Sequence, residues 1–267
     1  MLRPSPTASA GHFDGHTCAA VPRRALVQIR AVTFDFWNTL VREHPDSSKG
    51  RLARHVAALE RLGVSRTSAQ LEEAAARLRV RFDERWHANQ VVTPEVGATE
   101  LLAALDLEPE QTLHAEVAAV FRNGGDPSTL TVADGLTQAL DGLRGAGVRV
   151  GIICDAGFAP GATLRSYLAH HGLLDRFDHW SFSDEVGVFK PDPRIFQHAA
   201  AGLGVEDPAS LAHVGDLRRT DVAGALQLGW TAVRYRGLND DAPGPGELDA
   251  PIVLASHADL LAALGLR

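Results

Sequence analysis

The chain has 267 residues, of which 45% are hydrophobic, so it can bury the core of one large domain or of one domain with an insert. Its formal net charge of -7 argues against a nucleic acid partner, and no apolar run approaches the roughly eighteen residues of a membrane span. Only Cys18 and Cys154 are present, far apart in the sequence, which supports neither a disulfide framework nor a cysteine metal site. We therefore expect a globular, cytoplasmic protein that binds neither membranes nor nucleic acids.

Residues 1–28 mix Pro, Ala, Gly and Arg without periodicity and lack the continuous apolar stretch that a secretory signal needs. We expect them to form a disordered extension. A targeting peptide is the alternative, since Arg and Ser are present and acids are scarce, but Asp14 and the poor amphipathic pattern disfavour it. The folded part should begin near Ile29.

From Ile29 onward, short apolar runs alternate with helical patterns. The strand candidates are "IRAVTFDF", "GVRVGIICD", "HWSFS", "SLAHVGD" and "WTAVRYR". The helices predicted between them are 136–145, 160–170, 193–203 and 219–228, each with a proline near its start or a glycine near its end. This alternation predicts an α/β fold with a Rossmann-like parallel sheet and right-handed crossovers.

One interval breaks the alternation, because the long stretch between the first two strand candidates shows helical patterns and no convincing strand. We expect an inserted α-helical cap domain over 44–130, with a core formed by 29–43 and 131–267. The predicted helices of the insert begin at Ser47 or Ser48, at 68 after a capping box of Thr67 and Gln70, at Thr93-Pro94 and at Glu108-Pro109.

Ligands of an open α/β sheet bind at the carboxyl ends of its strands. Chemically useful side chains fall at these ends, namely Asp35, Cys154, Asp155, Lys190 and Asp216, with Asp221 five residues beyond Asp216. Asp35 can be a nucleophile, Lys190 adds positive charge, and a divalent cation between Asp35 and Asp216 offsets the repulsion between carboxylates and phosphate. A hard ion such as Mg²⁺ suits two carboxylates, a backbone carbonyl and waters. The pattern therefore indicates phosphoryl transfer.

The segments "FDFWNTL", "GIICDAG", "GVFKPDPRIF" and "HVGDLRRTDVAGA" occur in this order and resemble the four motifs of the haloacid dehalogenase superfamily of hydrolases. The resemblance covers most of residues 29–236, and the helical insertion is similar to the type 1 cap of that superfamily, which closes over the active site and selects substrate. It implies a Mg²⁺-dependent phosphatase for a small phosphorylated metabolite. By this resemblance, Asp35 becomes phosphorylated, Lys190 supports Asp35, and Asp216 binds magnesium together with Asp35.

The resemblance also assigns roles to the other candidates. Asp221 would orient Lys190 or a water on the metal, and the backbone carbonyl of Trp37 would be a metal ligand. The candidate substrate-binding residues are Thr39, Cys154, Asp155 and Ala156, and the backbone N–H groups of "CDAG" can cradle phosphate oxygens. Taken singly, each acid can merely cap a turn and Lys190 can be a solvated loop residue, but the ordered set favours the functional interpretation.

The sequence departs from the family pattern at Trp37, where phosphatase members have a second aspartate that acts as acid and base. Loss of such a group costs on the order of 10²- to 10⁴-fold in rate, so hydrolysis of alkyl phosphates should be slow unless another group substitutes. Asp155 is one candidate substitute, although we favour a role for its carboxylate in capping the next turn. Cys154 replaces the usual Ser or Thr, and a thiol is a weaker donor than a hydroxyl. We favour the interpretation that Cys154 is a small buried packing residue over the alternative that it is a nucleophile.

Substrate choice is expected to depend on the insert. In "RVRFDERWHANQ", Arg81, Arg85, Trp86 and His87 lie near a helix end where they can line a pocket. We favour the alternative that Phe82 and Trp86 form an apolar core pair and that the arginines are solvated. The candidates for a replacement acid or base from the insert are His87, Glu84 and Asp83.

Two other functions stay open. The 2-haloacid dehalogenases of the superfamily also carry an aromatic residue two positions after the nucleophile and use no metal, but "GDLRRTD" retains an acidic metal motif and Asn38 replaces their glycine. A scaffold or binding protein with weakened catalysis is the second alternative, because a fold survives damage to its active site.

Overall fold

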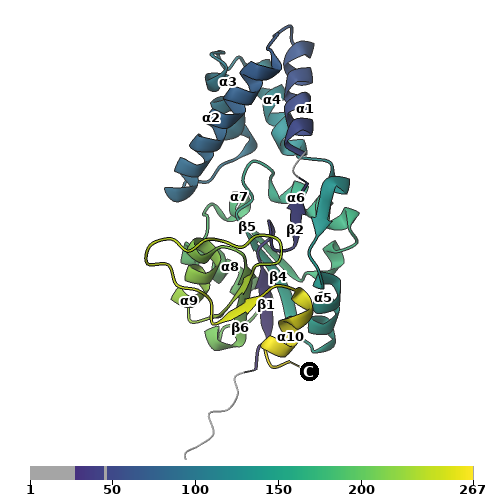
Figure 1. The fold of residues 1–267 in the computed structure, drawn as a ribbon, viewed down its shortest axis with the longest axis vertical. Helices are drawn as coiled ribbons and strands as arrows, with labels where there is room; N and C mark the ends of the chain where they lie inside the picture. Colours follow the sequence, from purple (N-terminus) through teal and green to yellow (C-terminus); the bar gives the residue numbers. More distant parts are fainter. Residues whose placement is uncertain (1–27, 45–46, 267) are drawn as a thin grey trace, which may run out of the picture.

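The computed structural model describes residues 28–44 and 47–266, so all but the last residue of the expected extension, 1–28, lies outside the described residues. Figure 1 shows a sheet with helices on both faces and a bundle of helices beyond one end of the sheet. Across the described residues, no helix combines the length and apolar composition that crossing a membrane requires.

The core is a six-stranded parallel sheet in the order β5-β4-β1-β6-β7-β8. Its strands are β1 (Ala31–Phe34), β4 (Arg149–Cys154), β5 (His179–Phe182), β6 (Leu211–Gly215), β7 (Thr231–Tyr235) and β8 (Ile252–Leu254). The five predicted strands and the Rossmann-like α/β fold are confirmed. The edge strand β8 was missed because only three residues pair with β7, too few to show an apolar period.

Two helical layers cover the sheet. The main helices are α5 (Leu136–Gly145), α6 (Gly161–His170), α8 (Pro193–Leu203) and α9 (Ala223–Gln227), and the shorter turns are α7 (Ser183–Val186), α10 (Leu260–Ala263), the π-helix Arg218–Val222 and the 3₁₀ segments Pro127–Thr129, Leu174–Arg176, Pro208–Ser210 and His257–Asp259. α5, α6 and α10 pack with Val32 and Phe34 on one face, whereas α8 and α9 pack with Ala31 on the other. Successive residues of β1 thus serve opposite layers, as the pleat of a strand requires.

The four helices of the insert are α1 (Ser47–Arg61), α2 (Ser68–His87), α3 (Pro94–Ala104) and α4 (Gln111–Asn123). The Thr67 and Gln70 capping box is formed, and Thr93 caps α3 as predicted. The helices bury their own apolar cluster, which includes Leu59, Leu71 and Val117. The antiparallel pair β2 (Val41–Glu43) and β3 (Leu130–Val132) was not predicted and forms the two connections between insert and sheet.

A buried histidine ties the C-terminal segment to the turn that follows Asp35. The His257 side chain is fully buried, its ring stacks 4.0 Å from that of Tyr235, and its Nε2 lies 2.8 Å from the Thr39 carbonyl oxygen. Nε2 therefore donates, while Nδ1 is buried without a partner among the described residues. Burial lowers the pKa of His257 to about 4, because the loss of hydration outweighs the opposing effects of the Thr39 carbonyl and the Asp134 charge.

We expect the free energy of unfolding to decrease as pH falls, because the unfolded chain protonates His257 near pH 6.5 and the folded chain only near 4. The contribution of His257 to the free energy of unfolding is complete above about pH 6.5. It should decrease by about 2 kcal/mol between about pH 7.5 and pH 5. Urea denaturation at several pH values, of the wild type and of His257→Gln, which keeps a donor for Thr39, measures this decrease. An equal pH dependence in both proteins would contradict this assignment.

Candidate active site

Three carboxylates gather where the central strands end. Asp35 directly follows β1, Asp216 directly follows β6, and Asp221 lies in the π-helix behind it. One oxygen of each lies within 4.8 Å of the other two, and all three residues are buried. The order of the strands dictates this meeting, because β1 and β6 are neighbours in the sheet.

The ammonium group of Lys190 lies inside this cluster. Its Nζ is 2.5 Å from Asp35 Oδ1, 2.6 Å from Asp221 Oδ1 and 3.1 Å from the carbonyl oxygen of Ile153. All three donors of the ammonium are thus satisfied, and only 2% of the residue is exposed. The lysine supplies the positive charge that two adjacent buried carboxylates need.

Asp221 has both oxygens engaged within the protein. Oδ1 also lies 3.0 Å from His213 Nε2, and Oδ2 accepts a bond of 3.0 Å from the backbone N–H of Leu217. Burial would raise its pKa, but Lys190 and His213 hold the pKa of Asp221 well below its usual range. These contacts orient Lys190. His213 was missed by the sequence analysis, although a polar residue within the apolar strand "LAHVG" was a signal for it.

Asp35 and Asp216 have the opposite electrostatic environment. Burial raises the pKa of Asp35 to about 7, against the opposing effect of Lys190, and burial together with the Asp35 charge raises the pKa of Asp216 to about 8. A single lysine therefore does not compensate the full charge of the cluster. The donor set consists of hard carboxylate oxygens in close proximity, which fits Mg²⁺ rather than a thiophilic metal.

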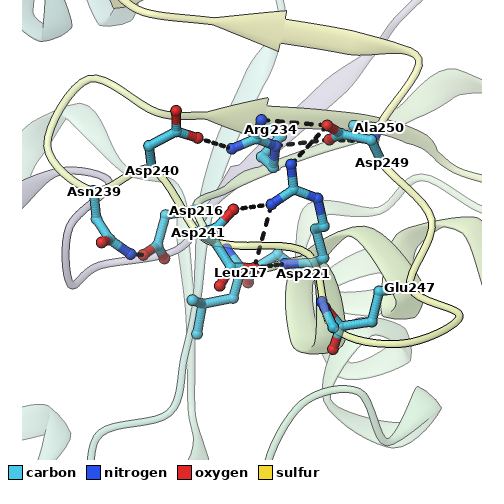
Figure 2. A network of polar contacts seen from close by, with 12 residues as sticks. Asp216, Leu217, Asp221, Arg234, Asn239, Asp240, Asp241, Glu247, Asp249 and Ala250 are labelled. Carbon is cyan, nitrogen blue, oxygen red and sulfur yellow. Dashed lines mark hydrogen bonds and ion pairs between the residues drawn. The ribbon is translucent and has the colours of Figure 1, made fainter.

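Asp216 is held by the loop after β7. Asn239 Nδ2 donates to Asp216 Oδ2 over 2.7 Å, and Figure 2 shows the loop bringing Asn239 to this carboxylate. Buried Arg218 and Arg234 both pair with Asp249, at 2.9 Å and 2.7 Å, and so fix the far end of the same loop. Sequence reasoning missed Asn239 because a loop without periodicity gives no indication of where its side chains point.

A tight turn presents Trp37 beside Asp35. Asn38 has a positive φ of 57°, a conformation that Asn tolerates better than most residues, and the backbone N–H of Val41 returns to the Phe36 carbonyl at 3.2 Å. The Trp37 ring packs at 4.9 Å from Phe36 and 6.4 Å from Tyr167. Trp37 therefore presents an aromatic surface at the position two residues after Asp35.

The strand end at β4 differs from expectation in one respect. The expectation that the Asp155 carboxylate caps the next turn is wrong: Oδ1 accepts from the backbone N–H of Lys190 at 2.9 Å, and Oδ2 accepts from Trp86 Nε1 at 2.8 Å. Cys154 is fully buried, and burial raises the pKa of its thiol well above the usual value, which agrees with a packing residue.

The two remaining substrate-binding candidates are partly occupied. The backbone N–H of Ala156 donates to Ser183 Oγ at 3.0 Å, so it is already used within the protein. Thr39 is buried, its carbonyl receives the His257 bond, and its Oγ1 has no partner among the described residues. Neither contact places these residues on a phosphate, so their role stays a prediction.

The end of α2 contacts the core domain. The expectation that Trp86 packs with Phe82 inside the insert is wrong, because Trp86 lies against Asp155 and under the Arg219 guanidinium, 3.8 Å from its ring centroid. Phe82 instead lies 5.2 Å from the ring of Phe158. The helix end extends beyond the bundle, which no helical period in the sequence could show.

The other polar residues of α2 stay outside the carboxylate cluster. Arg81 is largely exposed and pairs with Glu84, as the solvated alternative predicted, and Arg85 pairs with Glu100. His87 Nδ1 contacts the carbonyl of Asp83 in the same helix. The structure thus brings together Asp35, Lys190, Asp216 and Asp221, but not the acid and base candidates of α2.

Comparison with known proteins agrees with this arrangement. A family model described as haloacid dehalogenase-like hydrolase matches residues 29–229. Haloacid dehalogenase-like hydrolase domain-containing protein 3 of Bos taurus is 30% identical over 76% of this chain and 80% of its own. Glyceraldehyde 3-phosphate phosphatase of Methanopyrus kandleri is 27% identical over 84% of this chain and 94% of its own.

A solved structure has the same architecture. The crystal structure of a HAD phosphatase from Thermococcus onnurineus superimposes with a TM-score of 0.64 at 27% identity, over 89% of this chain and 98% of that chain. The similar proteins also include (S)-2-haloacid dehalogenase 4A of Burkholderia cepacia, which is 28% identical over 77% of this chain and 82% of its own.

Replacement of the central cation gives a direct test of the cluster. We expect Lys190→Met to lower the free energy of unfolding by about 3–5 kcal/mol, because it leaves buried carboxylates without their counterion. The matched control is Arg194→Met, which removes an exposed ion pair to Asp192 and should cost less than about 0.5 kcal/mol. Urea denaturation at neutral pH measures both, and equal losses would contradict the central role of Lys190.

Proposed function

This chain belongs to the haloacid dehalogenase-like hydrolases, and we propose that it is a Mg²⁺-dependent phosphatase that uses Asp35 as its nucleophile. The observation that carries the proposal is the contact of Lys190 Nζ with Asp35 at 2.5 Å and Asp221 at 2.6 Å, with an oxygen of Asp216 within 4.8 Å of both carboxylates. Two similar proteins whose names include the word phosphatase support this choice of reaction.

The residues divide the work as follows. The Asp35 carboxylate attacks phosphorus, and Lys190 holds the carboxylate in place while it neutralises part of the local charge. Asp35, Asp216 and the Trp37 carbonyl would hold Mg²⁺, with Asp221 acting through Lys190. When bound, Mg²⁺ supplies positive charge that offsets the repulsion between the carboxylates and the phosphate. Asn239 orients Asp216 for this task.

The same proposal gives the insert a role. We assign residues 29–43 and 131–267 to a catalytic core and 44–130 to a cap domain that selects a small phosphorylated substrate in the cytoplasm. The support is that α2 reaches the strand ends, where Trp86 bonds to Asp155. Asn89, just after α2, also accepts from the backbone N–H of Phe189 at 2.8 Å. These contacts, with those of Trp86 to Arg219 and of Phe82 to Phe158, hold the cap against the core.

We expect Asp35→Asn to lose phosphate release by at least about 10³-fold, because the amide is no nucleophile for phosphorus. In the wild type, acetyl phosphate with Mg²⁺ should add one phosphoryl group, which intact-protein mass spectrometry followed by peptide mapping places on Asp35. The control is Asp83→Asn, an exposed acid of α2, which should label like the wild type. Activity retained by Asp35→Asn would overturn the nucleophile assignment.

Chelation separates the phosphatase from the two alternatives. We expect phosphate release to stop when EDTA removes Mg²⁺ and to return on adding it back, because the clustered carboxylates need a cation to accept a phosphate. Halide release from a 2-haloacid in EDTA would instead favour a dehalogenase. A chain that neither labels at Asp35 nor responds to Mg²⁺ would favour a scaffold.

A further inference from the structure

An aromatic cavity lies between the insert and the ends of the strands. Its volume is about 350 Å³, and it is bounded on the core side by Trp37, Asp155 and Ala156, next to the nucleophile. Its walls contain two groups of rings: Phe158 lies 5.2 Å from Phe82 and 5.0 Å from Phe121, and Trp37 lies 6.4 Å from Tyr167. Such walls favour a flat aromatic guest.

The buried charged groups along this cavity are compensated or neutral. Arg51 pairs with Glu43, whereas Arg79 lies at the solvent-exposed surface of α2 rather than in the interior. His55 is buried and neutral near pH 7, since burial lowers its pKa to about 4. Among the described lining residues, the interior therefore offers no free cation for a second carboxylate or phosphate of the substrate. The part of the substrate that enters the cavity should be uncharged.

Among the described lining residues, no carboxyl group is free to act as a proton donor. Trp37 stands where an acid would lie. Burial raises the pKa of Asp155, but both of its oxygens accept N–H bonds, which favour the ionised form. Tyr167 accepts from the backbone N–H of Gly125, and burial raises the pKa of its phenol. An alcohol that departs from phosphorus here must leave as an anion. Phenols, with a pKa of about 10 as in tyrosine, do so far more readily than aliphatic alcohols, which approach the value of about 15.7 for water.

We propose that the substrate of this site is an aryl phosphate monoester, with its ring in the aromatic cavity and its phosphate at Asp35. This inference rests on the phosphatase function proposed above. An Asp35 oxygen attacks phosphorus, the bond from phosphorus to the aryl oxygen breaks, and the phenolate leaves with the electron pair. A water then attacks phosphorus, the bond from phosphorus to Asp35 breaks, and inorganic phosphate leaves. The proton that this water gives up reaches the phenolate through the solvent, so that one water is consumed in total.

The leaving group is tested with phenyl phosphate and benzyl phosphate, which carry the same ring but release a phenol and an aliphatic alcohol. We expect kcat/KM to be at least about 10²-fold higher for phenyl phosphate, because no acid assists the benzyl alcohol. In Trp37→Asp, which restores a carboxylate, the ratio should narrow by about tenfold or more through a faster benzyl reaction. Equal kcat/KM values in the wild type, or glycerol phosphate turned over faster than phenyl phosphate, would overturn the proposal.

The cavity is tested separately with substitutions in α2. Leu78 lines the cavity and is 8% exposed, whereas Val80, two residues on, is 57% exposed and outside it. We expect Leu78→Glu to lower kcat/KM for phenyl phosphate, relative to that for acetyl phosphate, by about tenfold or more, and Val80→Glu to leave the ratio unchanged. Phe82→Ala, a milder change in the same wall, should shift the ratio in the same direction.

Labelling of Asp35 by acetyl phosphate distinguishes failure of the aryl phosphate substrate from failure of the phosphatase function. If Asp35 is labelled but phenyl phosphate is not preferred, or if neither Leu78→Glu nor Phe82→Ala changes the ratio, the aryl substrate is wrong and the phosphatase stands. If Asp35 is not labelled and no phosphate is released from any ester, both are wrong. Preference for phenyl phosphate together with a reduced ratio in the cavity variants supports the inference.

Discussion

The burial of the Lys190 ammonium between Asp35 and Asp221 is the interaction on which the rest of the structure depends. Two carboxylates this close, taken out of water, would otherwise repel each other or bind protons. Lys190 stands 155 residues from Asp35 in the sequence, so this contact forms only when the loop after β5 has reached the end of β1. The same loop is fixed by its backbone, because the Lys190 N–H donates to Asp155. Charge balance and chain topology therefore support one another.

The two carboxylates near Asp35 have different environments. Asp221 is held ionised by Lys190 and His213. Asp216 has a neutral amide, Asn239, as its hydrogen-bond partner, and burial together with the charge of Asp35 raises its pKa. Asp221 therefore has a cationic partner within the protein, whereas Asp216 has no ion pair among the described residues.

Strand ends could be predicted from the sequence because parallel strands must bring their carboxyl ends to one edge. Alternation therefore placed Asp35 and Asp216 near one another, and the motif resemblance added Lys190, which lies beyond α7. Helix starts in the insert followed from local side-chain capping, as at Thr67. What could not be predicted depends on contacts between segments far apart in the chain. Trp86 has the spacing of a core residue relative to Phe82, yet α2 extends beyond the bundle and its indole meets Asp155. The strands β2 and β3 are too short to be predicted from an apolar period. They pair because the two connections to the insert run side by side.

Trp37 connects the electrostatics of the cluster with the shape of the cavity. An indole has no acidic proton to give at neutral pH, so the side chain removes acid catalysis from the position beside Asp35. The same ring, packed against Phe36 and near Tyr167, extends the aromatic wall toward the nucleophile. Both consequences concern the same part of the proposed substrate. An aryl oxygen can leave without a proton, and its ring can stack on the aromatic side chains. One side chain therefore sets the requirement for the leaving group and contributes to the surface that would select it.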